Sequence, residues 1–147
     1  MSDAELMGCI EWVALGFEMV SSIYSGWQFR PADAVAAYGL HFALRIGERV
    51  SVGARDWMGP LTSFGLELFR NGERVASGSG ADVLGSPLKA LHHLNDLLSD
   101  GAFGPPLTAG ELISTVTLTP AMVASPGDEW RAETTGIFLP PISVRLT

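Results

Sequence analysis

Glu18 is the residue of this sequence best suited to acid–base chemistry. It stands between Phe17 and Met19 in an otherwise apolar segment. Partial burial there would make the carboxyl group a usable general acid or base near neutral pH. A strand residue exposed to water, or a carboxylate hydrogen-bonded to a backbone amide, would give the same pattern. We therefore predict Glu18 as a catalytic candidate and keep the structural alternative open.

His41 is the second catalytic candidate, because an imidazole exchanges protons at cellular pH. His92 and His93 fall within a predicted helix, where packing or solvent exposure explains them more simply. The sequence has no His-x-His pair and no Cys/His spacing of the kind that binds a metal. We predict no metal site and no cofactor from these residues.

Three further side chains could bind a substrate. Trp27 and Tyr38 bracket the segment before His41 and could line an apolar pocket, although aromatic residues more often form cores or interfaces. Arg30 could pair with a carboxylate or enolate oxygen, or could cap a turn beside Pro31.

The elements that would position these residues are short. Apolar spacing predicts a helix from Ala4 to about Val13, followed by a strand that contains Glu18. Pro31 can start a short helix over Ala32 to Tyr38, and Gly39 to Arg49 alternates as a strand.

The clearest local signals lie in the middle of the chain. Leu61 to Arg70 and Glu73 to Ser77 flank an Asn-Gly pair, which predicts a β-hairpin. Pro87 to Leu98 has an apolar stripe with Ser86 as N-cap, which predicts an amphipathic helix. From Leu112 to Thr147, short β-branched runs alternate with turn residues, which predicts further strands.

Length and composition restrict the class of protein. The 147 residues, 47% apolar, predict one domain over 1–147. The net charge of -7, with nine scattered Lys and Arg, argues against nucleic-acid binding. The single Cys9, the absence of a signal-peptide pattern and apolar runs too short for a membrane helix predict a cytoplasmic protein with no membrane partner.

Several short motifs, in order, resemble the 2-keto-4-pentenoate hydratase branch of the fumarylacetoacetate hydrolase superfamily. They are Ile10-Glu-Trp-Val, Phe17-Glu-Met-Val, the stretch Gly78 to Leu91, Leu107-Thr-Ala-Gly-Glu-Leu-Ile and Pro126-Gly-Asp. The resemblance implies an α+β, mostly β fold: a mixed β-roll or barrel-like sheet with a few short helices. Gly78 and Gly80 would serve a close approach of the backbone.

Several residues that form the family's site differ in this sequence. In the family, a lysine, a Glu-x-Glu pair and a third glutamate build a Mg²⁺ or Mn²⁺ site; Glu18 resembles that third glutamate, and no Glu-x-Glu occurs here. One carboxylate cannot hold a hard divalent cation. The family's Asp-Asn-x-Ser stretch corresponds to Ala37 to Leu40, and its Thr-Gly pair to Thr115-Val116, so Thr115 remains a substrate-binding candidate.

Three functions follow as hypotheses. The first is a metal-independent lyase, isomerase or cyclase that acts on a small apolar carbonyl compound, with Glu18 and His41 as acid and base and Thr115, Tyr38 or Arg30 as polarising groups. The second is a half-subunit of a metal-dependent 2-keto acid hydratase or decarboxylase, completed by a partner. The third is a noncatalytic binding protein. An abbreviated fold would expose a sheet edge or an apolar surface, which predicts a homodimer or a partner subunit.

Overall fold

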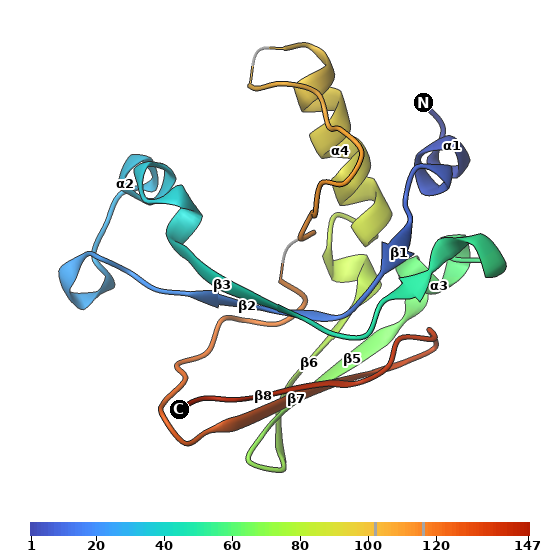
Figure 1. Cartoon of the computed structure of the whole chain (residues 1–147). Coiled ribbons are helices and arrows are strands. Elements are labelled where there is room, and N and C mark those ends of the chain that lie inside the picture. The colour runs from blue at the N-terminus through green and yellow to red at the C-terminus, as the bar shows by residue number, and fades with distance from the viewer. Residues whose placement is uncertain (102, 116) are drawn as a thin grey trace.

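The computed structural model describes residues 1–101, 103–115 and 117–147, and has an α+β architecture of antiparallel sheets with a few helices (Figure 1). The helices are α1 (Asp3–Gly8), α2 (Pro31–Ala36), α3 (Met58–Ser63) and α4 (Pro87–Ser99). The strands are β1 (Trp12–Val13), β2 (Gly16–Val20), β3 (His41–Ile46), β4 (Val50–Ser51), β5 (Gly65–Arg70), β6 (Glu73–Ser79), β7 (Glu129–Thr135) and β8 (Ile142–Arg145). Short 3₁₀ turns lie at Ser25–Trp27, Tyr38–Leu40, Val52–Ala54 and Gly80–Asp82. The predicted fold class is confirmed.

The largest sheet has the strand order β6-β5-β7-β8, and every neighbouring pair is antiparallel. The predicted hairpin is its β5–β6 pair. Asn71 and Gly72 have φ values of 51° and 85°, the left-handed conformation that a tight hairpin turn requires. The Asn-Gly pair therefore predicted this turn correctly.

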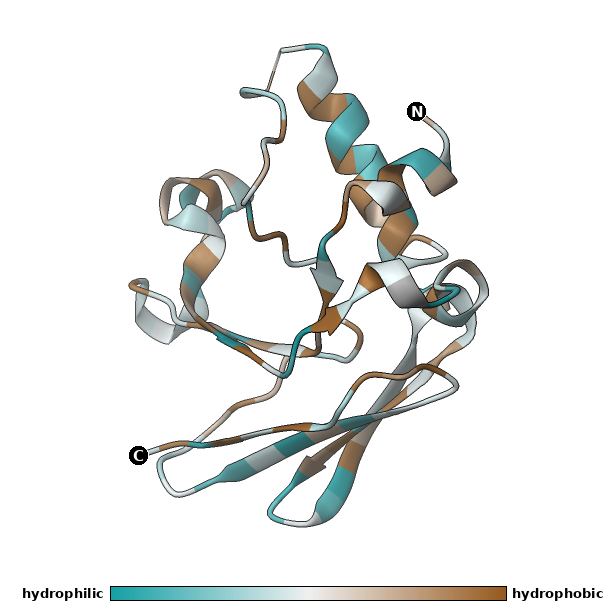
Figure 2. Cartoon of the chain, turned by 45° about the vertical axis from the view of Figure 1, so that its right-hand side comes forward, coloured by the Kyte–Doolittle hydropathy of each residue, from teal (hydrophilic) through white to brown (hydrophobic). Residues whose placement is uncertain are grey.

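The hydrophobic core lies between this sheet and helices α1, α3 and α4, which all lie on one side of it (Figures 1 and 2). The buried cluster consists of Leu6, Met7, Leu15, Trp57, Leu61, Phe64, Leu66, Leu68, Leu88, Leu91, Trp130, Ala132, Leu139 and Ile142. Helix α4 begins as predicted, with the Ser86 hydroxyl accepting the Lys89 amide at 3.3 Å. The predicted core helix thus lies with its apolar stripe on the sheet.

A separate ribbon projects from this body (Figure 1). Strands β2 and β3 pair with each other in their own two-stranded sheet, and the chain between them forms two 3₁₀ turns and α2. We call residues 16–46 the arm. Its α2 end lies away from the four-stranded sheet, which leaves most of the arm without a core beneath it.

Two predicted boundaries lie furthest from the observed ones. The first helix ends at Gly8 rather than near Val13, because Trp12–Val13 pairs with Val50–Ser51 as strand β1 and this tertiary pairing outweighs the helical spacing. The strand predicted from Leu61 begins at Gly65. The preceding residues form α3, whose first turn contains Pro60 and whose Met58 amide donates to the Asp56 carboxylate at 3.0 Å.

The C-terminal third contains fewer strands than predicted. Between Leu112 and Thr147, the described residues form only β7 and β8. Val116, which we aligned with the family's Thr-Gly pair, lies outside the described residues. Across the described part of the chain, no helix has the length and apolar character needed to cross a membrane.

Candidate functional site

Two predicted catalytic residues meet on the arm. In the β2–β3 ribbon Val20 lies opposite His41, and Glu18 lies two residues before Val20 on the same face. Glu18 and His41 are therefore diagonal neighbours, which long side chains can bridge. The Glu18 Oε1 atom and the His41 Nδ1 atom are 2.9 Å apart.

A β-bulge sets this geometry. The register shifts between Met19 and Val20, so that Phe42 is an extra residue opposite this step. Bulges bend a strand and redirect its side chains. Without the shift, Val20 would lie opposite Phe42, and His41 would lie opposite Ser21, on the other face of the ribbon from Glu18. The bulge thus brings the carboxylate and the imidazole together.

The pair is partly open to water. The side chain of Glu18 is 37% exposed and that of His41 is 47% exposed. When Nδ1 donates to the carboxylate, Nε2 of the imidazole stays available to accept a proton, and a protonated imidazole would form an ion pair with Glu18 instead. The arrangement can thus hold and pass on a proton.

His41 also lines a pocket of about 350 Å³ on the arm. Its wall is mostly apolar, and its polar groups come from Ser21, Tyr38 and His41 itself; Ile23, Ala36, Ala37 and Phe42 complete it. A pocket of this size, apolar with a few polar groups, suits a small organic ligand. Sequence reasoning missed Ser21, Ile23 and Phe42, because their contribution depends on the bulge and on the turn at Tyr38–Leu40.

The other predicted binding residues lie apart from this pocket. Trp27 lies on the arm, with its ring centroid 6.4 Å from that of Phe29, and does not line the pocket. Arg30 is 86% exposed, and its Nε lies 3.4 Å from the Asp33 carboxylate at the start of α2. It therefore occupies the turn-capping position that was the alternative to substrate binding. Thr115 lies in the irregular segment before 116 and is not among the pocket residues.

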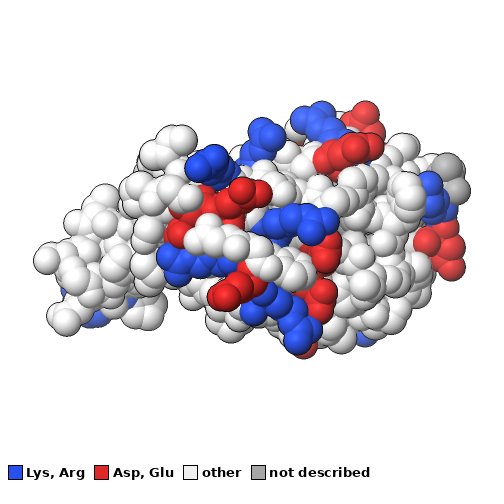
Figure 3. Space-filling model, turned by 90° about the horizontal axis from the view of Figure 1, so that it is seen from below, with Lys and Arg blue, Asp and Glu red and all other residues white. Residues whose placement is uncertain are grey.

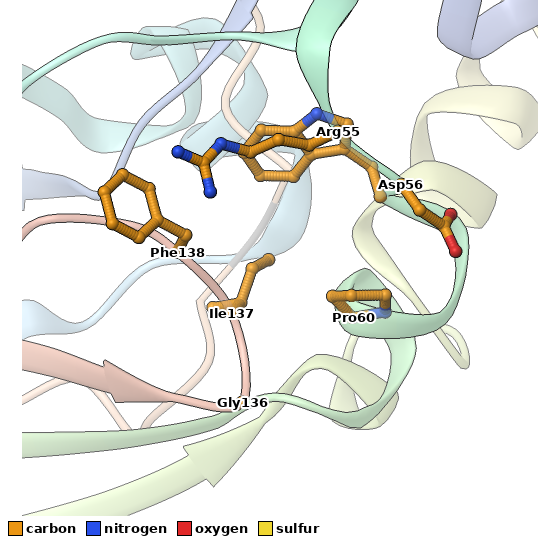
Figure 4. A pocket seen from close by; sticks show the side chains of 7 residues that line it. Arg55, Asp56, Pro60, Gly136, Ile137 and Phe138 are labelled. Atoms are coloured by element: carbon orange, nitrogen blue, oxygen red, sulfur yellow. The ribbon is translucent and has the colours of Figure 1, made fainter.

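A second pocket, of about 390 Å³, lies on the body rather than on the arm (Figure 4). Arg55, Asp56, Trp57 and Pro60 form one wall, and Gly136, Ile137 and Phe138 form the other. The Arg55 guanidinium carbon is 3.8 Å from the centroid of the Phe138 ring, so the cation stacks on the aromatic face. No sequence motif indicated this pocket, because its two walls are about 80 residues apart in the chain.

The described residues offer few ligands for a divalent metal ion. In the part of the chain that the structure describes, no three His, Cys, Asp or Glu side chains come close enough to hold one. Glu18 offers one carboxylate, and its neighbour is an imidazole rather than a second oxygen ligand. Mg²⁺ prefers oxygen ligands in an octahedral arrangement. The described residues therefore do not form a metal site by themselves.

Comparison with known proteins assigns the chain to a family. The family model described as fumarylacetoacetate (FAA) hydrolase C-terminal matches residues 1–139. The chain belongs to this family. The resemblance inferred from the motifs around Glu18 and from Gly78 to Leu91 is thus confirmed.

Two bacterial hydratases are similar to this protein over most of the chain. A 2-hydroxyhexa-2,4-dienoate hydratase from Comamonas testosteroni is 32% identical over 126 residues, 86% of this chain and 46% of the relative. A 2-keto-4-pentenoate hydratase from Paraburkholderia xenovorans (strain LB400) is 32% identical over 134 residues, 90% of this chain and 48% of the relative. The chain spans about half the length of these relatives.

A solved structure is likewise similar to this chain over about half of its own length. The 4-oxalocrotonate decarboxylase from Pseudomonas putida G7, complexed with magnesium and adipate, superposes with a TM-score of 0.83 and 29% identity. The match covers 99% of this chain and 52% of the decarboxylase. The chain is therefore related to 2-keto acid hydratases and decarboxylases and has the fold of about half of such an enzyme.

Proposed function

We propose that this chain provides one half of the active site of a 2-keto acid hydratase or decarboxylase, and that a partner subunit provides the other half. The observation that supports this most directly is the placement of Glu18. It lies partly exposed on the arm beside His41, and no cluster of metal-binding side chains surrounds it within the described residues. A carboxylate in this position suits a site shared with a second polypeptide.

The proposed role of each residue follows from the contacts. Glu18 supplies a carboxylate at the shared site, and His41 orients it through the 2.9 Å contact between Nδ1 and Oε1. The pocket beside His41 would hold the carbon chain of a small 2-keto acid, with the Tyr38 and Ser21 hydroxyl groups as hydrogen-bond partners. Lysine and paired carboxylates, which the family resemblance implies, would come from the partner.

The test is an activity measurement on the protein purified from its natural host with any subunit that accompanies it. The loss of 2-keto-4-pentenoate and of 4-oxalocrotonate is followed with and without Mg²⁺. We expect turnover only with both the partner and Mg²⁺, and a decrease of roughly 100-fold or more in Glu18→Gln. Glu48→Gln, an exposed change outside the arm, is the matched control and should keep the activity. Full activity of Glu18→Gln in the complex would overturn the proposal.

A second function is favoured by one observation, the direct Glu18–His41 contact beside an apolar pocket. In this case the chain alone would act as a metal-independent lyase, isomerase or cyclase on a small apolar carbonyl compound. Turnover by the chain alone, retained in excess chelator and abolished in both Glu18→Gln and His41→Gln, would select it over the shared site. Loss of turnover in chelator would exclude it.

A further inference from the structure

The pocket on the body has walls that the core and the adjoining turns hold in place. Trp57 is only 2% exposed, and its indole Nε1 donates to the Val52 carbonyl oxygen at 3.2 Å. On the opposite wall, the Thr134 hydroxyl donates to the Leu139 carbonyl oxygen at 3.2 Å and braces the turn between β7 and β8. The volume of about 390 Å³ is therefore present in the chain without a ligand, which is usual for small-molecule sites.

Arg55 brings a positive charge to this pocket and has no counter-ion in it. Within the part of the chain that the structure describes, no acidic side chain lies at ion-pair distance from the Arg55 guanidinium. Asp56 points away from it in Figure 4, and its carboxylate accepts the Met58 amide at 3.0 Å. The guanidinium is held by the face of the Phe138 ring instead, which leaves N–H donors free for an anion.

Arg55 stays unpaired although the chain has an excess of carboxylates. The sequence contains 16 acidic and nine basic residues. Figure 3 shows positive and negative side chains next to one another over one face of the molecule. The arginines that lie against a carboxylate include Arg30, Arg70, Arg74 and Arg131. A cation that has no such partner and stands beside apolar walls offers an anionic ligand a strong contact.

The combination of a cation and a cavity separates Arg55 from Arg49. Arg49 also stacks on an aromatic ring, with its guanidinium carbon 4.4 Å from the centroid of the Trp12 ring. It lines neither of the two pockets described above. Stacking of an arginine is therefore not sufficient for a site. At Arg55 the stacked guanidinium adjoins an enclosed apolar space, which a ligand can fill.

The lining restricts the class of ligand. A carboxylate can accept two parallel N–H bonds from one guanidinium. Trp57, Pro60, Ile137 and Phe138 give the pocket apolar walls with two aromatic rings, which suit a flat hydrocarbon body. Several negative charges are unfavourable, because the pocket has one cation, Asp56 lies at its edge and the whole chain has a net charge of -7. A neutral molecule would leave the guanidinium without an anionic acceptor.

We propose that this pocket is a second ligand site, which binds a small monocarboxylic acid with a flat apolar body, such as an aromatic carboxylate. The carboxylate would lie on Arg55, and the apolar body would lie against Pro60 and Ile137. The site shares no residue with the pocket beside His41. The proposal does not rest on the proposed function, because it concerns binding to the chain alone and requires no turnover.

The experiment is a titration of the purified chain with benzoate, followed by amide and indole NMR signals. We expect saturable shifts at 55–59, at 136–138 and at the Trp57 indole, with a Kd on the order of 1 mM. Arg55→Gln should raise this Kd at least about tenfold, because the charge-assisted contact is lost. Arg49→Gln is the matched control and should leave the Kd unchanged. Benzamide, which has the same shape without the charge, should bind at least about tenfold more weakly than benzoate.

A second variant tests the site from the opposite wall. Phe138 is 59% exposed, so Phe138→Asp should fold, and its carboxylate would compete with benzoate for Arg55. We expect this variant also to raise the Kd at least about tenfold. Shifts that do not saturate by about 20 mM, shifts confined to the pocket beside His41, or equal Kd values for the wild type and Arg55→Gln would overturn the proposal. The Glu18→Gln activity test concerns only the proposed function, so the two can fail separately.

Discussion

Asp128 is a buried carboxylate of the body that has several polar partners. It is only 6% exposed, and its carboxylate accepts hydrogen bonds from the Asn71 side chain at 3.1 Å and the Ser125 amide at 2.9 Å. The Arg70 guanidinium lies 2.8 Å away. Asp128 thus ties the β5–β6 turn to the segment that leads into β7. The Pro126-Gly-Asp motif, quoted above for the family resemblance, therefore has a structural role.

The stability of the fold should depend on pH through Asp128. The hydrogen bond from Arg70 holds the pKa of Asp128 below its ordinary value of 3.8, and the Ser125 amide and the Asn71 side chain act in the same direction. A carboxyl group whose pKa is lower in the folded state stabilises the fold above its unfolded pKa, and this contribution is lost as pH falls through the folded pKa. We expect Asp128→Asn to lower the melting temperature at pH 7 by roughly 5 °C or more.

The same variant should remove part of the acid sensitivity. Melting followed by circular dichroism between about pH 2 and pH 6 should show a smaller slope in Asp128→Asn than in the wild type. Asp100→Asn is the control, because Asp100 is exposed at the end of α4. Equal slopes for Asp128→Asn and the wild type would contradict the assignment of this carboxylate as a stabilising anion.

Among the elements, β6 and the 3₁₀ turn that follows it show why glycines stand where side chains would otherwise pack. A Cβ atom at Gly78 would overlap the backbone carbonyl of Leu118, and one at Gly80 would overlap the carbonyl of Leu61 and the ring of Phe64. The expectation that these glycines allow a close backbone approach is confirmed. The irregular segment around Leu118 can lie on β6 only because Gly78 has no side chain.

The close approach of Gly78 and the Leu118 backbone should make the stability of the fold sensitive to a side chain at position 78. Gly78→Ala should lower the free energy of unfolding by about 2–3 kcal/mol, since a backbone segment, not a flexible side chain, must move. Gly59→Ala in α3 is the matched control. Its Cβ would have no neighbour within 4 Å, and alanine favours a helix, so it should stabilise by about 0.5–1 kcal/mol. Urea unfolding measures both changes; equal stabilities would show that the Leu118 segment adapts freely.

Local patterns were sufficient for some elements and not for others. The Asn71-Gly72 turn and helix α4 were predictable because a turn or a cap and the adjoining apolar pattern agree within a few residues. The end of α1 and the start of β5 were missed, because strand pairing and a proline-containing turn outweigh short apolar spacing. For the candidate site, Glu18 and His41 were predicted singly. Their contact depends on a cross-strand register and a bulge, which spacing alone does not reveal.

On the scale of the whole molecule, the body and the arm differ in how they are held. The buried cluster joins α1, α3, α4 and the four-stranded sheet, and from the arm only Phe17 packs against it as a partly buried residue. Opening of the arm therefore exposes little of the core. Segments with few buried contacts open at lower free energy than core strands. The residues proposed for chemistry thus lie on the part of the fold with the fewest buried contacts.

Hydrogen exchange should reveal this difference. In dilute protein, amides of β2 and β3 should exchange at least about tenfold faster than those of β5 and β7, because they can open without global unfolding. Binding of the proposed partner subunit should protect the arm amides while those of β5 and β7 stay unchanged, since the proposed shared site lies on the arm. Arm amides that exchange as slowly as those of β5 would show that the arm and the body unfold as one unit.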